Sequence, residues 1–256
     1  MRLSERVVLI TGASSGLGRS VALALAHRGN RVAVVARRGP LLDTLAEEIR
    51  GYGSDPLPLV GDALDPEFAQ SAVNAVLDRW GRLDACLLNI GHGPTQDLRT
   101  IDAAAASSIM RLNYDTLVNF FFPVAAVMKT QPEGGLIAHT NSLAGYLGIP
   151  LQGPYCAAKA AGRLFMETAQ IELADQGVRA ITICPGFIGT GTGNDEELER
   201  PFEVTVEQAA DAIIRAMERE DPESAFPRRL YALTRVARWL PRTVRQAALR
   251  KVIGGE

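Results

Sequence analysis

The chain has 256 residues, enough for one large domain with a sizeable core but too few for a second full domain. Hydrophobic residues make up 47% and charged residues 22% of the sequence, a globular composition, and the formal net charge of −2 excludes a general affinity for nucleic acid. The charge is uneven: residues 1–227 carry 19 Lys and Arg against 28 Asp and Glu, whereas residues 228–256 carry 8 against 1.

The cysteines and the N-terminal segment indicate the cellular compartment in which the protein is expected. Cys86, Cys156 and Cys184 are too few and too scattered for a disulfide framework or a zinc site. We therefore expect no metal, a reducing cytoplasmic environment, and three thiols that serve as packing residues. The N-terminal segment has no apolar region followed by a small-residue cleavage site, and no window reaches the roughly 18 consecutive apolar residues of a membrane span. Neither secretion nor membrane spanning is indicated.

Short apolar segments alternate along the chain with longer segments of helical periodicity. This alternation predicts an α/β fold, a doubly wound parallel sheet whose strands are buried on both faces and whose ligands bind at the carboxyl ends of the strands. Strands are predicted at residues 6–10, 31–36, 56–60, 84–90, 135–140 and 179–185. Helices are predicted at residues 16–28, 40–50, 66–80, 102–128, 155–175 and 205–219.

The first predicted strand runs directly into a glycine-rich turn, TGASSGLG at residues 11–18. Gly12, Gly16 and Gly18 permit a tight turn and let the backbone approach a pyrophosphate, which the free N–H groups and dipole of the next helix attract. A turn without a ligand is the alternative, but the strand before it and the helix after it favour a dinucleotide site. No Gly-Lys-Ser/Thr follows, which excludes a Walker-type phosphate loop.

The end of the second predicted strand bears on which dinucleotide is bound. An NAD site usually has Asp or Glu here for the ribose 2′-hydroxyl, whereas this strand ends at Ala36, followed by Arg37 and Arg38. Two guanidinium groups suit a 2′-phosphate, so NADP(H) is predicted over NAD, with the larger effect expected from Arg37 because it lies nearer the strand end. The alternative is two solvated arginines. Asp62, after the third strand, is a candidate partner for the adenine edge.

Further motifs follow in order along the chain. They are LNIGHG at 88–93, Asn113 in RLNYDT, Ser142, Tyr155 with Lys159 four positions later, and PGFIGT at 185–190. With TGASSGLG, they make the chain resemble the short-chain dehydrogenase/reductase family, in its single-domain, Rossmann-type branch, over nearly the whole length up to residue 220. One departure is the Leu88-Asn89 pair, where the family usually has two adjacent asparagines.

The pair Tyr155 and Lys159 lies in a predicted helix, where residues four apart share a face. The neighbouring ammonium, helped by the positive nicotinamide ring, is expected to lower the tyrosine pKa from its usual value of about 10, so that Tyr155 acts as the general acid/base. Ser142 would donate a hydrogen bond to the substrate oxygen. By resemblance, Asn113 holds a water that relays protons, and Lys159 also binds the nicotinamide ribose.

There are two alternatives to a catalytic role of this kind for these residues. A lone Tyr-x-x-x-Lys is more often a half-exposed helix face, but Ser142 and Asn113 at the family's positions favour catalysis. A serine hydrolase is disfavoured because no GxSxG surrounds Ser142.

The expected dinucleotide site combines the glycine-rich turn, the two arginines and the positions matched by resemblance. Pro185 and Gly186 would shape the turn under the nicotinamide, and Thr190 resembles the residue that binds its carboxamide. The whole expected set is Gly12, Ser14, Ser15, Gly16, Leu17, Gly18, Arg37, Arg38, Asp62, Ala63, Asn89, Gly91, Tyr155, Lys159, Pro185, Gly186, Ile188 and Thr190.

Substrate specificity is expected to come from three segments at the strand ends, residues 92–100, 143–152 and 187–204. Their apolar residues favour a lipophilic carbonyl or alcohol over a sugar, although most ligand pockets have such a lining. The expected apolar lining is Leu143, Tyr146, Leu147, Ile149, Leu151 and Phe187.

Residues 228–256 are predicted to form a basic amphipathic helical extension of the single Rossmann-type domain at residues 1–227. Apolar residues recur near helical spacing with arginines between them, and Pro241 divides two short helices. Such a tail can lie on an anionic membrane surface, bind an acidic partner, cover the substrate mouth or form an oligomer contact. A packed terminal helix with a solvated basic face is an equal alternative.

The sequence therefore predicts an NADP(H)-dependent oxidoreductase that transfers a hydride between nicotinamide and a carbonyl or secondary alcohol. The alternatives are an NAD-dependent dehydrogenase, a dinucleotide-sensing protein with little turnover, and a membrane-peripheral scaffold. Retention of both Tyr155 and Lys159 argues against a sensor. The resemblance implies a homodimer or homotetramer paired through the helices near 102–128 and 155–175, and no nucleic-acid partner is expected.

Overall fold

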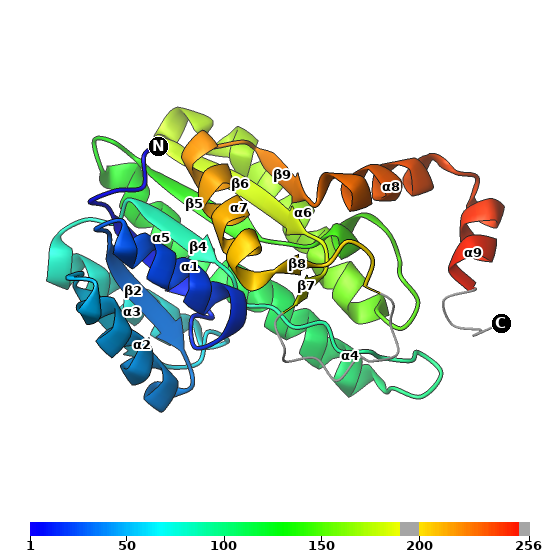
Figure 1. Ribbon diagram of the computed structural model, residues 1–256, viewed down its shortest axis with the longest axis horizontal. Coiled ribbons are helices and arrows are strands. Elements are labelled where there is room, and N and C mark those ends of the chain that lie inside the picture. The colour runs from blue at the N-terminus through cyan, green and yellow to red at the C-terminus, as the bar shows by residue number, and fades with distance from the viewer. Residues whose placement is uncertain (190–199, 251–256) are drawn as a thin grey trace.

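A computed structural model describes residues 1–189 and 200–250 and shows a seven-stranded sheet (Figure 1). Its strands pair in parallel in the order β3-β2-β1-β4-β5-β6-β9, which confirms the predicted doubly wound α/β sheet. The chain order reverses between β1 and β4, so a ligand crevice is expected beyond the ends of these strands. The strands are β1 (Val7–Thr11), β2 (Arg31–Ala36), β3 (Pro56–Val60), β4 (Ala85–Leu88), β5 (Gly135–Thr140), β6 (Val178–Pro185) and β9 (Glu223–Phe226).

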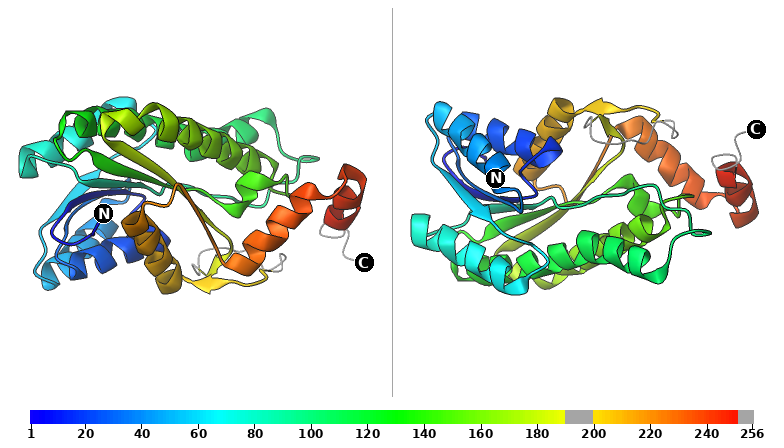
Figure 2. Two further views of the ribbon diagram at one scale, coloured as in Figure 1. Left: turned by 90° about the horizontal axis from the view of Figure 1, so that it is seen from above. Right: turned by 90° about the horizontal axis from the view of Figure 1, so that it is seen from below.

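Helices cover both faces of the sheet (Figure 2). The apolar side chains of α1, α2 and α7 pack on one face, and those of α3, α5 and α6 pack on the other, which gives two separate core layers. Each helix presents its apolar positions to the strands at the spacing that the sequence predicts. The bounds are α1 (Gly16–His27), α2 (Gly39–Gly51), α3 (Pro66–Trp80), α5 (Thr116–Thr130), α6 (Gly153–Glu172) and α7 (Val206–Arg219).

Shorter elements lie around the carboxyl ends of the strands. Helix α8 contacts both β9 and the 3₁₀ turn η2, and α8 and α9 extend away from the sheet (Figure 1). None of the helices described for this chain is long and apolar enough to cross a membrane. The shorter elements are α4 (Ala103–Met110), η2 (Leu143–Tyr146), η3 (Ala174–Gln176), β7 (Ile188–Gly189), β8 (Val204–Thr205), α8 (Arg228–Trp239) and α9 (Arg242–Arg250).

The long helix predicted at 102–128 is divided into three parts. Helix α4 passes into a π-helical segment, η1 (Arg111–Asp115), before α5 begins at Thr116. A π turn carries one more residue than an α turn and is found mostly at functional sites. Here it contains the buried Asn113, whose Nδ2 donates to the Ile109 carbonyl at 3.0 Å.

Two strands differ from their prediction. Strand β9 was not predicted, because Glu223 and Ser224 interrupt any apolar run and the strand forms by pairing with Thr182–Pro185 of β6. Strand β3 was predicted to be buried on both faces, but it lies at the edge of the sheet and is half exposed. An edge position accommodates Pro56 and Pro58, which lack backbone donors.

Asp84, just before β4, ties three segments together. Its buried carboxylate accepts from the Val7 N–H at 2.8 Å and pairs with Arg82 and Arg6, both of which also reach Glu133. These contacts fix the start of β1 against β4 and against the segment before β5. A buried carboxylate depends on such partners, and its removal leaves them unpaired.

Replacement of Asp84 by Ala is expected to lower the free energy of unfolding by about 2–4 kcal/mol, because the Val7 N–H and two guanidinium groups lose their acceptor. Urea unfolding followed by circular dichroism measures this loss. The matched control is Asp78→Ala on the exposed face of α3, expected within about 0.5 kcal/mol of the parent. Equal effects of the two substitutions would contradict a structural role for Asp84.

Candidate active site

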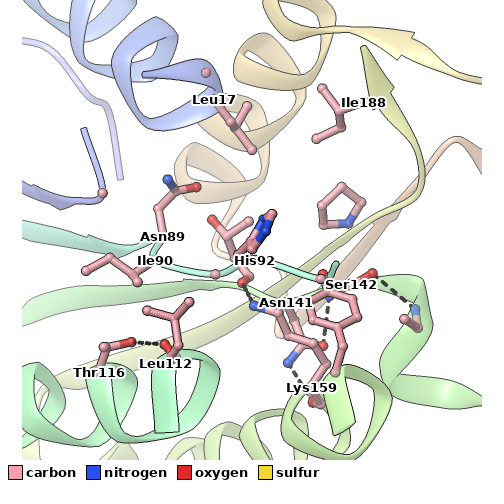
Figure 3. Close-up of a pocket in the computed structure, with 18 of the residues that line it drawn as sticks. Leu17, Asn89, Ile90, His92, Leu112, Thr116, Asn141, Ser142, Lys159 and Ile188 are labelled. Carbon is pink, nitrogen blue, oxygen red and sulfur yellow. Dashed lines mark hydrogen bonds between the residues drawn. The ribbon is translucent and has the colours of Figure 1, made fainter. Parts of the chain in front are cut away.

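A cavity of about 820 Å³ opens where the strands end, on both sides of the reversal in strand order. Residues from the ends of β1, β2, β3, β4, β5 and β6, from α6 and from α8 line it. In Figure 3, Leu17 and Ile188 lie across the cavity from Ser142 and Lys159. The cavity therefore has one part beside the glycine-rich turn and another beside the predicted catalytic residues.

The glycine-rich turn between β1 and α1 is tight. Gly12 has a φ of +71° and Gly16 a φ of +53°, values that L side chains rarely adopt. A Cβ on Gly18 would clash with the Gly12 carbonyl oxygen and lie 2.7 Å from Asn89 Nδ2, so Gly18 packs behind the turn and does not line the cavity. Ser15 makes no side-chain cap with α1, which leaves the first-turn N–H groups available to an anion.

The remaining residues expected near the adenine ribose also line the cavity. Arg38 donates from its guanidinium to Ser14 Oγ at 2.7 Å and to Ser15 Oγ at 2.6 Å, so it lies against the glycine-rich turn. Arg37 is exposed, and its side chain makes no hydrogen bond within the described part of the chain. Lining residues expected here are Ser14, Ser15, Gly16, Leu17, Arg37, Arg38, Asp62 and Ala63.

The loop after β4 passes close to the predicted catalytic residues because it contains glycines. A Cβ on Gly91 would lie 2.8 Å from Lys159 Nζ and 2.9 Å from Asn113 Oδ1. A Cβ on Gly93 would lie 2.9 Å from the Tyr155 ring. Asn89 begins this loop and donates its backbone N–H to Thr11 Oγ1 at 2.9 Å, which ties the loop to the end of β1.

Ser142, Tyr155 and Lys159 all line the cavity, and Figure 3 shows Ser142 and Lys159 on the same side of it. Tyr155 and Lys159 lie one turn apart on α6, with Lys159 Nζ 5.8 Å from the centroid of the Tyr155 ring. Ser142 forms the N-cap of η2 and is hydrogen-bonded to Tyr155. Lys159 is 2% exposed and donates from Nζ to the Thr140 carbonyl at 3.0 Å.

The surroundings of Tyr155 within the chain raise its pKa. Burial raises it to about 12, and the hydrogen bond from Ser142 offsets only part of this effect. The lowering expected from Lys159 together with a positive nicotinamide ring stays a prediction, because the cost of desolvating a phenolate is the largest effect among the residues of the chain itself. Burial also lowers the pKa of Lys159 to about 8. At neutral pH the site therefore holds a protonated phenol beside an ammonium group.

Asn113 serves as a backbone clamp in this structure. Its Nδ2 donates to the His92 carbonyl at 2.9 Å, and its Oδ1 accepts from the His92 N–H at 3.1 Å. The π segment places it beside the loop after β4, and it is not among the described residues that line the cavity. The predicted role in holding a water stays a prediction.

Asn141 is a site residue that the sequence analysis missed. Its Nδ2 donates to the Lys159 carbonyl at 2.9 Å, and its Oδ1 accepts from the Ser142 N–H at 2.8 Å. It thereby joins the end of β5 to α6 and fixes Ser142 relative to Lys159. His139, behind it, is fully buried, and burial together with Lys159 holds its pKa well below the usual value. The only sequence signal for Asn141 is its position directly before Ser142.

The substrate part of the cavity has an apolar wall. Of the six residues expected there, Leu143, Leu147, Ile149 and Phe187 line it. Tyr146 and Leu151 do not: the Tyr146 hydroxyl donates to Cys184 Sγ at 3.7 Å, and the Leu151 carbonyl accepts from the Gln96 N–H at 2.6 Å. His92 and Arg200, from the predicted segments 92–100 and 187–204, also line the cavity, and Leu230 and Thr234 are lining residues that were not predicted.

The nicotinamide end of the expected site is described in part. Pro185, Gly186 and Ile188 line the cavity, whereas Thr190 lies outside the described residues. A Cβ on Gly186 would lie 2.6 Å from Leu230 Cδ2, so this turn packs directly against α8. Among the described residues, no group of three or more His, Cys, Asp or Glu could hold a metal ion.

The shape and chemistry of the cavity fit a nicotinamide dinucleotide. A phosphate-binding helix N-terminus, two arginines and a Tyr–Lys pair occur along one continuous cavity, in the positions expected for the two ends of such a molecule. The glycines leave the space that side chains would fill at both ends.

Comparisons with known proteins agree with this geometry. A family model described as short chain dehydrogenase matches residues 6–201. An uncharacterized oxidoreductase of Myxococcus xanthus is 32% identical over 98% of both chains. An A-factor type gamma-butyrolactone 1′-reductase (1S-forming) of Streptomyces virginiae is 34% identical over 72% of both chains.

Two further similarities concern length and fold. The chain is 28% identical to probable oxidoreductase EphD of Mycobacterium tuberculosis and spans 45% of that protein's length. An alcohol dehydrogenase from the archaeon Thermococcus sibiricus, solved in complex with 5-hydroxy-NADP, superposes with a TM-score of 0.76 at 26% identity, over 86% of this chain and 94% of that one. From the family match and the full-length relative, the chain belongs to the short-chain dehydrogenase family, an oxidoreductase family that acts on alcohol and carbonyl groups with a nicotinamide dinucleotide.

Proposed function

We propose that this protein is an NADP(H)-dependent carbonyl reductase and alcohol dehydrogenase. The observation that supports this most is the single cavity that has Arg38 and the glycine-rich turn at one end and Ser142, Tyr155 and Lys159 at the other. Asn89 and Ile188 line the same cavity. The bound dinucleotide would supply or accept the hydride at the substrate carbon.

The residues of the chain account for the proton chemistry. In reduction, Tyr155 Oη donates its proton to the substrate oxygen, and the raised pKa of Tyr155 keeps that proton in place at neutral pH until the oxygen becomes negative. Ser142 hydrogen-bonds the same oxygen and stabilises the charge that develops on it. The ammonium of Lys159, held by the Thr140 carbonyl, stabilises the phenolate that remains on Tyr155.

The preference for NADP(H) rests on the end of β2. Ala36 provides no carboxylate for a ribose 2′-hydroxyl, and Arg38 lies against Ser14 and Ser15 at the edge of the cavity. We therefore assign the larger share of 2′-phosphate binding to Arg38, which reverses the order expected from distance to the strand end. The structural relative from Thermococcus sibiricus was solved with an NADP derivative, which supports the same choice.

The substrate is proposed to be a lipophilic carbonyl compound or secondary alcohol. Leu143, Leu147, Ile149, Phe187 and Leu230 give the space beside Tyr155 an apolar wall. Such a wall binds alkyl or ring groups and offers few partners for the hydroxyl groups of a sugar. One relative of the chain is named as a gamma-butyrolactone reductase, which is consistent with a substrate of this polarity.

We also propose that the protein forms a homodimer or homotetramer through α5 and α6. Phe122 on α5 and Leu164 on α6 are 60% and 55% exposed, and Phe122 packs edge-to-face against Phe165. Together they form an apolar surface on these two neighbouring helices, of the kind that a self-complementary contact covers.

A cytoplasmic location is proposed as well, supported by the three buried cysteines, which are all free thiols.

Substitution of Tyr155 by Phe tests the catalytic assignment. The variant retains the ring and is expected to bind NADPH like the parent, but its turnover should fall by about 10²- to 10⁴-fold because the proton donor is gone. NADPH oxidation is followed by absorbance over a panel of ketones. Tyr52→Phe, on an exposed ring outside the cavity, is the control and should keep full activity. Turnover of Tyr155→Phe within tenfold of the parent would reject the assignment.

The cofactor assignment is tested by separate Arg38→Ala and Arg37→Ala substitutions. A charge-assisted hydrogen bond contributes about 1.5–3 kcal/mol, so Arg38→Ala is expected to weaken NADPH binding by about 10- to 100-fold. Arg37→Ala should have a smaller effect, and NADH binding should change little in either variant. Fluorescence titration of both cofactors measures these affinities. A parent protein that binds NADH as tightly as NADPH contradicts the proposal.

The oligomer is tested by Phe122→Asp combined with Leu164→Asp. Four or more charges brought into a symmetric apolar contact are costly to desolvate, so the double variant should become monomeric at micromolar concentration. Light scattering gives the mass. Leu41→Asp, at an exposed position of α2 on the other face of the sheet, is the control and should retain the parent mass. A monomeric parent would contradict the proposal directly.

A further inference from the structure

The outer surface of α8 and the start of α9 expose an unusual density of large apolar side chains. Trp239 is 84% exposed, Val236 59%, Leu233 57% and Val244 50%. Leu240, between the two helices, is also exposed. These five side chains occur within one short stretch of sequence and form what we term the α8 outer face.

The same surface is strongly basic. Arg228, Arg229, Arg235 and Arg238 of α8 are all exposed, and Arg242 begins α9 beside them. No acidic residue occurs in the sequence between Glu223 and Glu256. An apolar stripe accompanied by arginines and without carboxylates has the composition of a helix that lies at the interface of an anionic membrane.

The other side of α8 is already occupied by the protein itself. Leu230 and Thr234 line the substrate part of the cavity, and the Tyr231 ring packs against Tyr146 with centroids 5.8 Å apart. Helix α8 extends away from the sheet (Figure 1), and the side chains of its outer face are exposed. Side chains exposed along one face of a helix can contact one surface at the same time.

We propose that the α8 outer face binds the surface of a bilayer that contains anionic phospholipids. Trp239 and the aliphatic side chains would enter the boundary between headgroups and acyl chains, where tryptophan is preferred, and the arginines would pair with lipid phosphates. A second copy of the chain fits less well, because a symmetric contact would bring the arginines of one face against those of the other. The arginines and the anionic headgroups have opposite charges, and this complementarity favours a lipid surface over a second copy of the chain.

Membrane binding would place the substrate cavity at the lipid surface, because one helix contributes to both. Leu230 and Thr234 face the cavity while Val236 and Trp239, on the same helix, face outward. A lipophilic substrate dissolved in the bilayer would then enter from the side on which it is concentrated. The entry of substrate from the bilayer rests on the proposed function. The binding of the α8 outer face to lipid does not rest on it and is measured without enzyme turnover.

The test is cosedimentation of the full chain with phosphatidylcholine vesicles, with and without about one third phosphatidylglycerol. The parent should bind the anionic vesicles and not the neutral ones, and salt should weaken binding by shortening the screening length from about 10 Å at 0.1 M to about 3 Å at 1 M. Arg229→Gln combined with Arg238→Gln should lower the partition coefficient by about tenfold or more. Trp239→Ser combined with Val236→Ser should lower it by about tenfold.

Matched controls separate this surface from general charge and apolarity. Arg50→Gln combined with Arg215→Gln removes two exposed arginines from α2 and α7, and Tyr52→Ser removes an exposed ring; neither variant should change binding. Equal binding of the parent to neutral vesicles, or an equal loss in the arginine controls, would overturn the proposal. The proposal would also be overturned if the parent bound no vesicles. It would be overturned as well if light scattering showed that the α8 substitutions convert a dimer to a monomer, since this face would then join two copies of the chain.

Discussion

The ammonium group of Lys159 is the buried charge around which this active site is built. It is 2% exposed and its hydrogen bond goes to the backbone carbonyl of Thr140, so the end of β5 must be held against α6. Asn141 does this through a bond to the Lys159 carbonyl, and the same amide accepts from Ser142. On the other side, Gly91 lets the loop after β4 approach Nζ more closely than any other residue would allow. Lys159, Asn141, Ser142 and the end of β5 are thus held together by hydrogen bonds around one buried cation.

Burial has opposite effects on the two titratable groups of this site, and together these effects suit proton transfer. Desolvation raises the pKa of Tyr155 to about 12 and lowers that of Lys159 to about 8, which brings both closer to their neutral forms. A phenol that holds its proton is the species that a carbonyl oxygen needs as reduction begins. The reverse reaction needs a phenolate, and any further positive charge in the cavity would shift Tyr155 in that direction.

Local patterns in the sequence predicted most of the sheet, five of the long helices and the placement of Tyr155 and Lys159 one turn apart on a helix, because these depend on periodicity and on residues close together in the sequence. What was missed depends on contacts between distant segments. Strand β9 exists because β6 offers it hydrogen-bonding partners, and α8, which follows β9 and contacts it, contributes Leu230 and Thr234 to the cavity lining. The rise in the Tyr155 pKa on burial was not predicted, because burial cannot be judged from the spacing of Tyr155 and Lys159. Arg38 differs from Arg37 through its contacts with Ser14 and Ser15, which lie 24 and 23 residues away.

The two prolines of β3 have a consequence for the behaviour of the protein at high concentration. The Asp55 carbonyl accepts from the Val32 N–H of β2. The backbone N–H and C=O groups of successive residues in a strand point alternately to its two sides, so those of Pro56, Pro58 and Val60 point to the free edge of the sheet. Two of these three residues have no N–H to offer, and the free edge is left almost without donors. An incoming strand of another molecule therefore finds carbonyl groups but no ladder of partners, which protects the sheet against edge-to-edge aggregation.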